Sequence, residues 1–503
     1  MTQGRKGISL APGEGRRRMG IARLLSVVAA MFVIAALVAG TAGSSYAGKK
    51  KEAGGGHGGL LDTVVVSNNG ALFNGSLETF PVGSGPLAHP QFLIHGTNTF
   101  LGASGGPIGD AVSSLDGHIA VAIPLDFLDL TASLGPPVGC GPFGQPAASP
   151  LFGTGLVEIF GDSSTGNSAP EVEICSPNFA VGAPNTTGIF FPQGVGFEDP
   201  FDQLHTGHEI LAVANNFPEV DQDAAICAGS GLGTVTLGTI TLYDRTTFHP
   251  GLNNSPPFVN NPVSAINPFT GAMYTQNASI GGCLTSLAGP VSVQFDQNGF
   301  LFVVNNAGLF AAALAATPRL VSVFQPDAAL TTEAPFSRGD VFPVSLIGIA
   351  GTETGGDILQ PVGEAVLTLG FEDDLLFVTD TGDNSIKIFD PFQNPDILIG
   401  FAFAGQLEGV IHGGSTKLKG PEGTALSPDG DTLYVTNSDN DTLSMFTDIT
   451  DDMDGGDIAP TLIIKSNHSK MILPVGVAVL GQFTPTPTPA PSSTPTEGAL
   501  GAE

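Results

Sequence analysis

Basic residues are scarce in this sequence. Lysine and arginine number 17 against 47 aspartates and glutamates, so the 503-residue chain carries a formal net charge of −30 at pH 7. A surface this acidic repels nucleic acid and anionic membranes, and no stretch interleaves aromatic with basic side chains. We therefore expect no nucleic-acid partner. The charge suits solubility and divalent cations, although a solvated acidic surface without a ligand is the simpler interpretation.

Long helical patterns are also missing. Charged residues make up only 13% of the chain and hydrophobic residues 42%, a balance that favours a globular protein over a disordered one. Short runs rich in Val, Ile, Leu and Phe alternate with clusters of Gly, Pro, Asn and Asp. This alternation predicts an all-β chain.

Recognisable catalytic motifs are absent as well. No GxSxG, Walker or GxGxxG sequence stands in the strand–turn–helix setting that these motifs require, and no CxxC or Cys/His spacing suits zinc. The four cysteines are expected to form two disulfides in an oxidising compartment. Three pairings are open, and we favour Cys140–Cys175 with Cys227–Cys283, because each closes the shorter loop.

The N-terminus predicts export. Arginines at 16–18 and 23 precede an apolar run over 24–39, and Ser45-Tyr46-Ala47 offers small residues for signal peptidase. The run is short for a membrane span, which needs about 20 residues. We expect a signal peptide over 1–47, cleaved after Ala47, and a secreted or periplasmic protein. An uncleaved signal anchor is the alternative.

Two low-complexity segments flank the region that can fold. Residues 48–59 (GKKKEAGGGHGG) have the composition of a flexible linker. Residues 484–503 form a Pro/Thr-rich tail that cannot bury a core, and we expect this tail to be disordered. The folded domain is therefore expected over 60–483.

A repeating unit fills this domain. Its clearest copy, Gly420 to Phe446, divides into strands over 424–427, 432–436 and 442–446, separated by Pro-Asp-Gly and by an Asn/Asp turn. Five copies are complete, and a sixth has only its first strand. Each copy starts at a proline of a PxGx-like segment; these are Pro107, Pro192, Pro290, Pro361, Pro421 and Pro474.

The N-terminal part of the domain supplies what the sixth copy lacks. Residues 63–69 and 76–80 look like a second and a third strand without a first. One blade built from both chain ends would close a ring of blades and leave no open edge. We predict a six-bladed β-propeller closed by N- and C-terminal strands that share one blade. A seventh blade within 123–190 is the alternative.

The repeat has the form P-x-G-x-A-φ-x-x-x-G, then φ-φ-V-T-[ND], then φ-x-φ-F, where φ is apolar. Thr436-Asn437 in LYVTN and Thr379-Asp380 in LFVTD match it best. In these residues the chain resembles NHL repeats and the related YVTN repeats, most strongly over 361–446. The resemblance implies a β-propeller that binds ligands at the mouth of its channel or on the loops of one face. Related six-bladed propellers include calcium-dependent lactonases of the SMP-30 and paraoxonase types and an amidating lyase.

Two carboxylates are candidate axial metal ligands. The fourth residue of each PxGx segment is expected near the axis, and only Asp110 and Glu364 are acidic there. They belong to the first and fourth blades, which face each other in a ring of six. Two opposed oxygen ligands suit a cation such as Ca²⁺. The alternative is that both side chains point into an interface between blades or to water.

An acidic loop over 448–457 is a second calcium candidate. It lacks the twelve-residue EF-hand pattern and its terminal Glu, so a solvated loop between blades is the simpler interpretation. Its possible ligands are Asp448, Asp451, Asp452, Asp454 and Asp457.

Two functions are open from the sequence. The first is a binding or scaffold module that recognises an extracellular or periplasmic protein or glycan through loops within 125–190 and 215–285. The second is a calcium-dependent hydrolase or lyase of the lactonase or amidating-lyase type. We favour the first, because no catalytic set is recognisable. His205 and His208 could bind a metal, but histidines in a surface loop are the commoner case.

Overall fold

We describe a computed structural model of the chain, which places most of residues 63–480. Residues 1–62 and 481–503 lie outside the description, as do several internal stretches, the longest of which are 125–154, 176–188, 199–208, 217–237, 245–264, 307–318 and 326–341. Within the described part, no helix is long and apolar enough to cross a membrane. The side chains of the four cysteines, both histidines at 205 and 208, the export signal and the tail fall outside it, so the predictions about them stay predictions.

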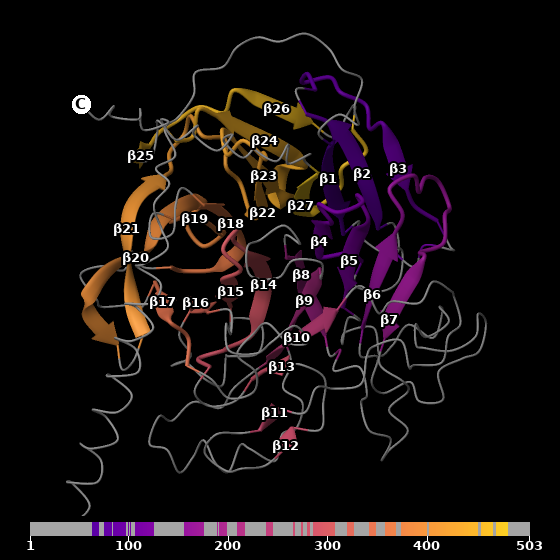
Figure 1. Cartoon of the computed structure of the whole chain (residues 1–503). Coiled ribbons are helices and arrows are strands. Elements are labelled where there is room, and N and C mark those ends of the chain that lie inside the picture. Colours follow the sequence, from indigo (N-terminus) through magenta and orange to yellow (C-terminus); the bar gives the residue numbers. More distant parts are fainter. Residues whose placement is uncertain are drawn as a thin grey trace, which may run out of the picture. The chain divides into compact units, whose positions relative to one another are not determined.

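The described residues form six blades of four antiparallel strands each, arranged as a β-propeller (Figure 1). A parallel pairing of β17 with β21 joins blades 3 and 4 into one larger sheet. Blade 1 contains β4 (Gly109–Val112), β5 (Ile119–Ile123), β6 (Leu156–Phe160) and β7 (Val172–Cys175). Blade 2 contains β8 (Pro192–Phe197), β9 (Ile210–Asn215), β10 (Thr239–Asp244) and β13 (Ser279–Ile280). Blade 3 contains β14 (Pro290–Phe295), β15 (Leu301–Asn305), β16 (Leu320–Phe324) and β17 (Ser345–Ile347).

The later blades follow the same order. Blade 4 contains β18 (Pro361–Thr368), β19 (Asp374–Asp380), β20 (Ser385–Ile399) and β21 (Ala402–Ile411). Blade 5 contains β22 (Pro421–Leu426), β23 (Thr432–Asn437), β24 (Thr442–Thr447) and β26 (Leu462–Lys465). Blade 6 contains β27 (Pro474–Leu480), β1 (Thr63–Asn68), β2 (Ser76–Pro81) and β3 (Phe92–Ile94). Outside this scheme lie β11 (Ala265–Ile266), β12 (Met273–Tyr274), β25 (Gly455–Gly456) and the 3₁₀ helix η5 (Ser438–Asn440).

Blade 6 joins the two ends of the domain, as the sequence predicts. The C-terminal strand β27 pairs antiparallel with the N-terminal β1, with Val477 opposite Val66 and Val479 opposite Val64. Figure 1 shows yellow β27 beside indigo β1. The first strands contact one another in the order β4, β8, β14, β18, β22, β27 and back to β4. The ring is therefore closed with six blades, and β6 and β7 belong to blade 1 rather than to a seventh blade.

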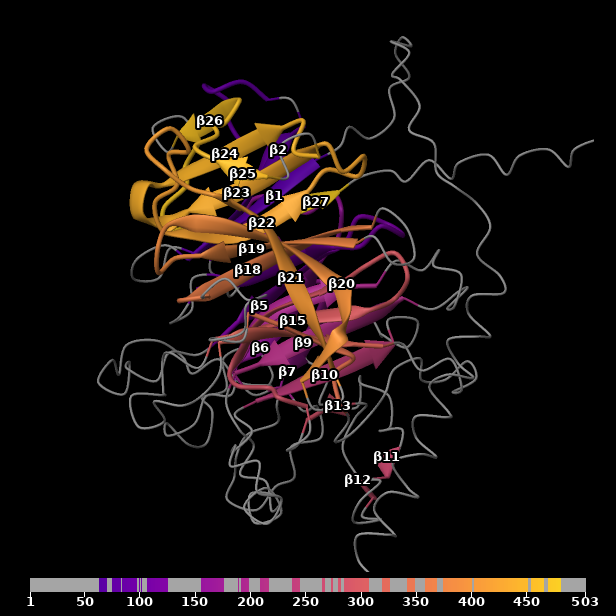
Figure 2. The same cartoon turned by 90° about the vertical axis from the view of Figure 1, so that its left-hand side faces the viewer.

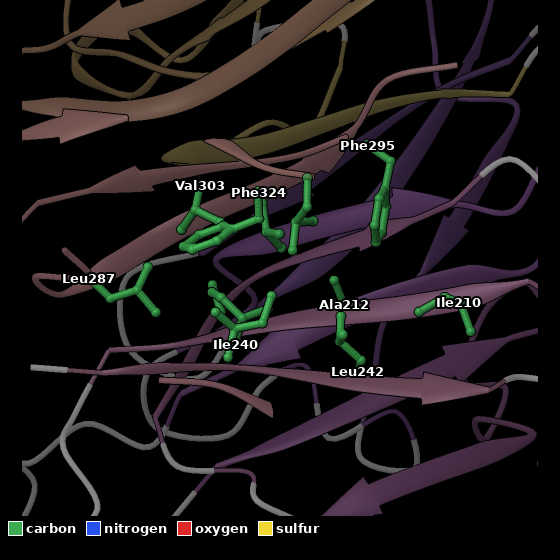
Figure 3. Packing of buried hydrophobic residues seen from close by; sticks show 12 residues of the cluster. Ile210, Ala212, Ile240, Leu242, Leu287, Phe295, Val303 and Phe324 are labelled. Atoms are coloured by element: carbon green, nitrogen blue, oxygen red, sulfur yellow. The ribbon is translucent and has the colours of Figure 1, made fainter. Parts of the chain in front are cut away.

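Apolar clusters fill the spaces between neighbouring blades. Val64 and Val66 pack toward blade 5, whereas Val65 between them packs toward blade 1. Figure 2 shows β23 and β24 beside β1 and β2, which agrees with this packing. Figure 3 shows the equivalent cluster between blades 2 and 3, where Ile240 and Leu242 face Val303 and Phe324. Because each blade is covered on both faces, its second strand is a nearly continuous apolar run, as in β5 (IAVAI) and β15 (LFVVN).

The third residue of the PxGx segment brings neighbouring first strands close together. A Cβ atom added to Gly363 would lie 2.3 Å from the carbonyl oxygen of Glu422, and one added to Gly423 would lie 2.6 Å from that of Val475. No side chain fits at these distances. Glycine at this position therefore lets the first strands form the wall of a narrow channel.

A buried Asn or Asp ends the second strand in blades 2 to 6. In blade 5, Asn437 Oδ1 accepts a hydrogen bond from the Lys419 N–H at 3.0 Å, and Nδ2 donates to Ser444 Oγ at 3.1 Å. Blade 4 carries Asp380 instead, which pairs with the buried Lys387. These side chains satisfy backbone groups at one mouth of the channel, which is the structural role that Asx residues in turns are expected to have.

Candidate functional site

The central channel is the candidate site. It is a cavity of about 780 Å³ lined by the first strand of every blade. At the end where the PxGx segments begin, polar residues that follow the second strands surround the opening, among them Asn69, Asn306, Thr381 and Ser438. We call this end the proline mouth. A ligand entering there meets residues from several blades at once.

The described part of the channel lining is acidic and contains no basic side chain. Among its described residues there is no lysine, arginine or histidine. Five carboxyl side chains belong to the lining: Asp110, Asp296, Glu364, Glu422 and Asp439. Because carboxylates in a low-dielectric wall repel one another and lack a counter-charge, the channel favours cations or protonated acids.

Asp110, the first predicted ligand, lies in the interface between blades 6 and 1. Its Oδ1 accepts a hydrogen bond from Ser67 Oγ at 3.3 Å and lies directly against the Gly476 backbone. Asp110 is 9% exposed, and Oδ2 has no hydrogen-bond partner among the described residues. Burial raises the pKa of Asp110 to about 8, so the side chain is largely neutral at pH 7.

Glu364, the second predicted ligand, lies between blades 3 and 4. It is 3% exposed, and its nearest polar neighbour is the backbone of Val304. Burial among apolar side chains raises the pKa of Glu364 well above its ordinary value. Blades 1 and 4 do face each other across the ring, but each carboxyl group lies in its own interface. This arrangement matches the alternative in which both side chains point into an interface between blades.

The structure does not assemble the predicted residues into a metal centre. Within the described residues, no three His, Cys, Asp or Glu side chains gather closely enough to hold a metal ion. In the acidic loop, Asp448 and Asp454 are exposed, and Asp451 and Asp452 lie outside the described residues. Asp457 accepts hydrogen bonds from Ser415 N at 2.6 Å and Ser415 Oγ at 3.2 Å. Calcium binding therefore stays a prediction without a preformed ligand set.

Glu422 is a channel residue that the sequence analysis missed. It occupies the second position of its PxGx segment, where the other blades carry Val, Ile or Gln. Burial raises its pKa, the hydroxyl of Ser438 opposes that rise, and the nearby charge of Asp439 adds to it. The acidic residue is visible in Pro421-Glu422-Gly423, but it stands at the second position of the repeat, whereas the axial prediction concerns the fourth.

Asp296 is the second carboxyl group that was missed. It follows β14 at the opposite end of the channel and is 4% exposed. Burial raises its pKa to about 6, and hydrogen bonds from Asp374 and Phe300 oppose that rise. A hydrogen bond between two carboxyl groups requires a shared proton. No sequence pattern indicated this pair, because Asp374 belongs to the next blade.

Comparison with known proteins finds only distant structural similarity. No family model and no curated protein matches the chain. Among solved structures, the chain resembles one from a nidogen/laminin complex at 9% identity and a TM-score of 0.41, with 84% of this chain and 99% of that chain covered. It resembles the periplasmic gluconolactonase of Pseudomonas aeruginosa at 13% identity and a TM-score of 0.37, with the same coverage. A Lactobacillus plantarum protein is also 13% identical, with a TM-score of 0.36 and 84% and 100% covered. Similarity at this level carries no argument about function.

Proposed function

We propose that the chain is an exported NHL/YVTN-like β-propeller that acts as a binding or scaffold module through the loops at the proline mouth. Export is supported by the N-terminal sequence, and the family by the repeat pattern over 361–446. The partner is an extracellular or periplasmic protein or glycan. The loop-face proposal rests on one observation, namely that the long connections of blades 1 to 3 attach at the proline mouth.

These connections join the second strand to the third. They leave β5 at Ile123, β9 at Asn215 and β15 at Asn305. Asn215 is paired with Pro192 and Asn305 with Pro290, so these strands end at the proline mouth. In blades 4 and 5 the same connection needs only residues 381–384 and 438–441. The extra residues are not required to close a blade, and loops carried by a rigid scaffold are common binding surfaces.

The hydrolase or lyase alternative has weaker support. It rests on Asp110 and Glu364 as ligands of one metal ion. The two carboxyl groups lie in different interfaces of opposite blades, and no third ligand joins them among the described residues. We therefore do not build a reaction on them.

The proposal is tested by shortening the connections. Residues 125–154, 217–237 and 307–318 are each replaced by Asn-Gly, which makes a tight turn. Glycan arrays and cross-linking to envelope proteins identify what the full chain binds. At least one shortened chain should lose that binding while its melting temperature stays unchanged.

Two controls keep the test interpretable. The first two replacements remove Cys140 and Cys227, so single Cys→Ser variants at these positions report the effect of a lost disulfide alone. Removal of residues 484–503 should change neither binding nor stability. If all three shortened chains bind every identified partner as the full chain does, the loop-face proposal is wrong.

A further inference from the structure

The described residues supply no positive charge to balance the carboxyl groups of the channel. Five carboxyl groups belong to its lining, and no basic side chain does among the described residues. Asp110 Oδ2 and both carboxyl oxygens of Glu364 are buried without hydrogen-bond partners there. Buried carboxyl groups normally find a cation, a hydrogen-bond donor or a proton. At this site the described residues supply some hydrogen-bond donors, such as Ser67 for Asp110, but no cation.

Glu422 is the carboxyl group best placed to meet a ligand. It lines the channel at the proline mouth and is only partly buried, unlike Asp110 and Glu364. Its hydrogen-bonding neighbour is Ser438, whose hydroxyl has a single proton. The carboxylate of Asp439 lies nearby and provides no donor. The Gly420 carbonyl oxygen lies 3.2 Å from that hydroxyl and competes for the proton. The Glu422 carboxylate therefore lacks a committed donor.

The channel wall beside Glu422 also contains apolar side chains. At the same position of the repeat, blades 1, 3, 4 and 6 carry Ile108, Val291, Val362 and Val475, and all four line the cavity. Exposed Leu473 adds to the lining at the proline mouth. A hydrated metal ion gains nothing from such a wall, whereas an alkyl chain is stabilised by leaving water.

We propose that the channel binds an ammonium group carried on an alkyl chain, with Glu422 as its counter-ion at the proline mouth and the apolar wall around the alkyl part. An ammonium group needs one carboxylate and a few neutral acceptors, not a chelating set. The ligand is either a free alkyl diamine or a lysine side chain of a partner, since both present the same chemistry. The strongly negative protein also attracts such cations from a distance.

Calorimetric titration of the full exported chain tests the proposal. The probes are pentane-1,5-diamine, the neutral pentane-1,5-diol, the peptide acetyl-Gly-Lys-Gly-amide and calcium chloride, each added separately at pH 7. The diamine or the peptide should bind, and the diol should not. The tighter of the two binders identifies the source of the ammonium group.

Two variants locate the site. Glu422→Gln should weaken binding by about 10- to 100-fold, because a charged hydrogen bond contributes about 1.5–3 kcal/mol. Glu408→Gln is the matched control; Glu408 lies on β21 and does not line the channel, so its replacement should leave the affinity unchanged. Binding should also weaken as salt rises, since salt screens the ion pair.

Several outcomes would overturn the inference. The inference is wrong if neither the diamine nor the lysine peptide binds. It is also wrong if these probes bind equally well to the native chain and to Glu422→Gln. Calcium binding with both ammonium probes silent would assign the channel to a metal instead. The chains with shortened connections should still bind the diamine, so failure of the loop-face proposal and failure of this one are distinguishable.

Discussion

Blades 4 to 6 and blades 1 to 3 join their first strands by different means. In blade 5, Thr436 Oγ1 accepts the Gly423 N–H at 2.8 Å and lies 3.2 Å from the carbonyl oxygen of Val475 in the next blade. Thr379 bridges blades 4 and 5 in the same way, and Ser67 bridges blades 6 and 1 through Asp110. We call these three the hydroxyl links. The equivalent residues in blades 1 to 3 are Ala122, Ala214 and Val304.

The difference shows what the Thr of the V-T-[ND] pattern does. Its hydroxyl satisfies the backbone of its own glycine and reaches the neighbouring first strand. Where Ala or Val replaces it, adjacent blades still pack through apolar clusters. The repeat pattern is therefore clearest in the half whose blades are linked by hydroxyls, and weakest in the half that carries the long connections.

The hydroxyl link at Asp110 should make stability depend on pH. The acid's pKa rises from 3.8 to about 8 on folding, so the folded state binds more protons between these values. Stability should then fall as pH rises from about 4 to about 8, by up to about 1.4 kcal/mol per pH unit. No other titratable group lies on the strands packed against Asp110, namely β1, β5, β8 and β27.

Asp110→Asn removes this titration and provides the measurement. Urea unfolding at several pH values gives the free-energy difference between native and variant chains. As pH rises, the variant should become more stable relative to the native chain, because only the native chain contains the Asp110 carboxyl group. Other buried acids contribute equally to both chains and cancel in the difference. A difference that is constant from pH 4 to pH 8 would show that Asp110 keeps an ordinary pKa.

The ion pair of blade 4 should give the next largest effect. Asp380 accepts the Leu359 and Gln360 N–H groups, each at 2.7 Å, and pairs with Lys387. Lys387→Met leaves a buried carboxylate without its cation and should cost about 3–5 kcal/mol. The double variant Asp380→Asn, Lys387→Ser copies the Asn437–Ser444 pair of blade 5 and should recover most of that loss. Unfolding in urea measures both, and equal stability of the single and double variants would contradict the account.

The neutral hydroxyl link should have the smallest effect. Thr436→Val leaves the Gly423 N–H without its partner, which should cost about 1–3 kcal/mol. Thr461→Val is the control, because its hydroxyl bonds only to Thr447 on the exposed edge of blade 5. A loss at Thr436 no larger than at Thr461 would mean that the links are incidental.

The sequence predicts the architecture better than the site. Most blades repeat the same strand order and the same turn residues, so the copies support one another. The unpaired strands at 63–69 and Pro474 to Leu480 indicate how the ring closes. Side-chain direction is not repeated in this way. Glu364 follows a glycine in a bulged stretch where the register with β19 shifts, so its position in the repeat could not tell channel from interface. Glu422 was not predicted because it occupies the second position of the repeat rather than the fourth.

Truncation tests the closed ring most directly. A chain ending at residue 483 keeps β27, and a chain ending at residue 470 lacks it, so that β1 loses its partner on the channel side. Thermal unfolding should show the longer chain melting as the full chain does. The shorter chain should show no cooperative transition, because blade 6 cannot form and the apolar faces of blades 5 and 1 are exposed. If both truncated chains melt at the same temperature, the two ends of the domain do not close the propeller.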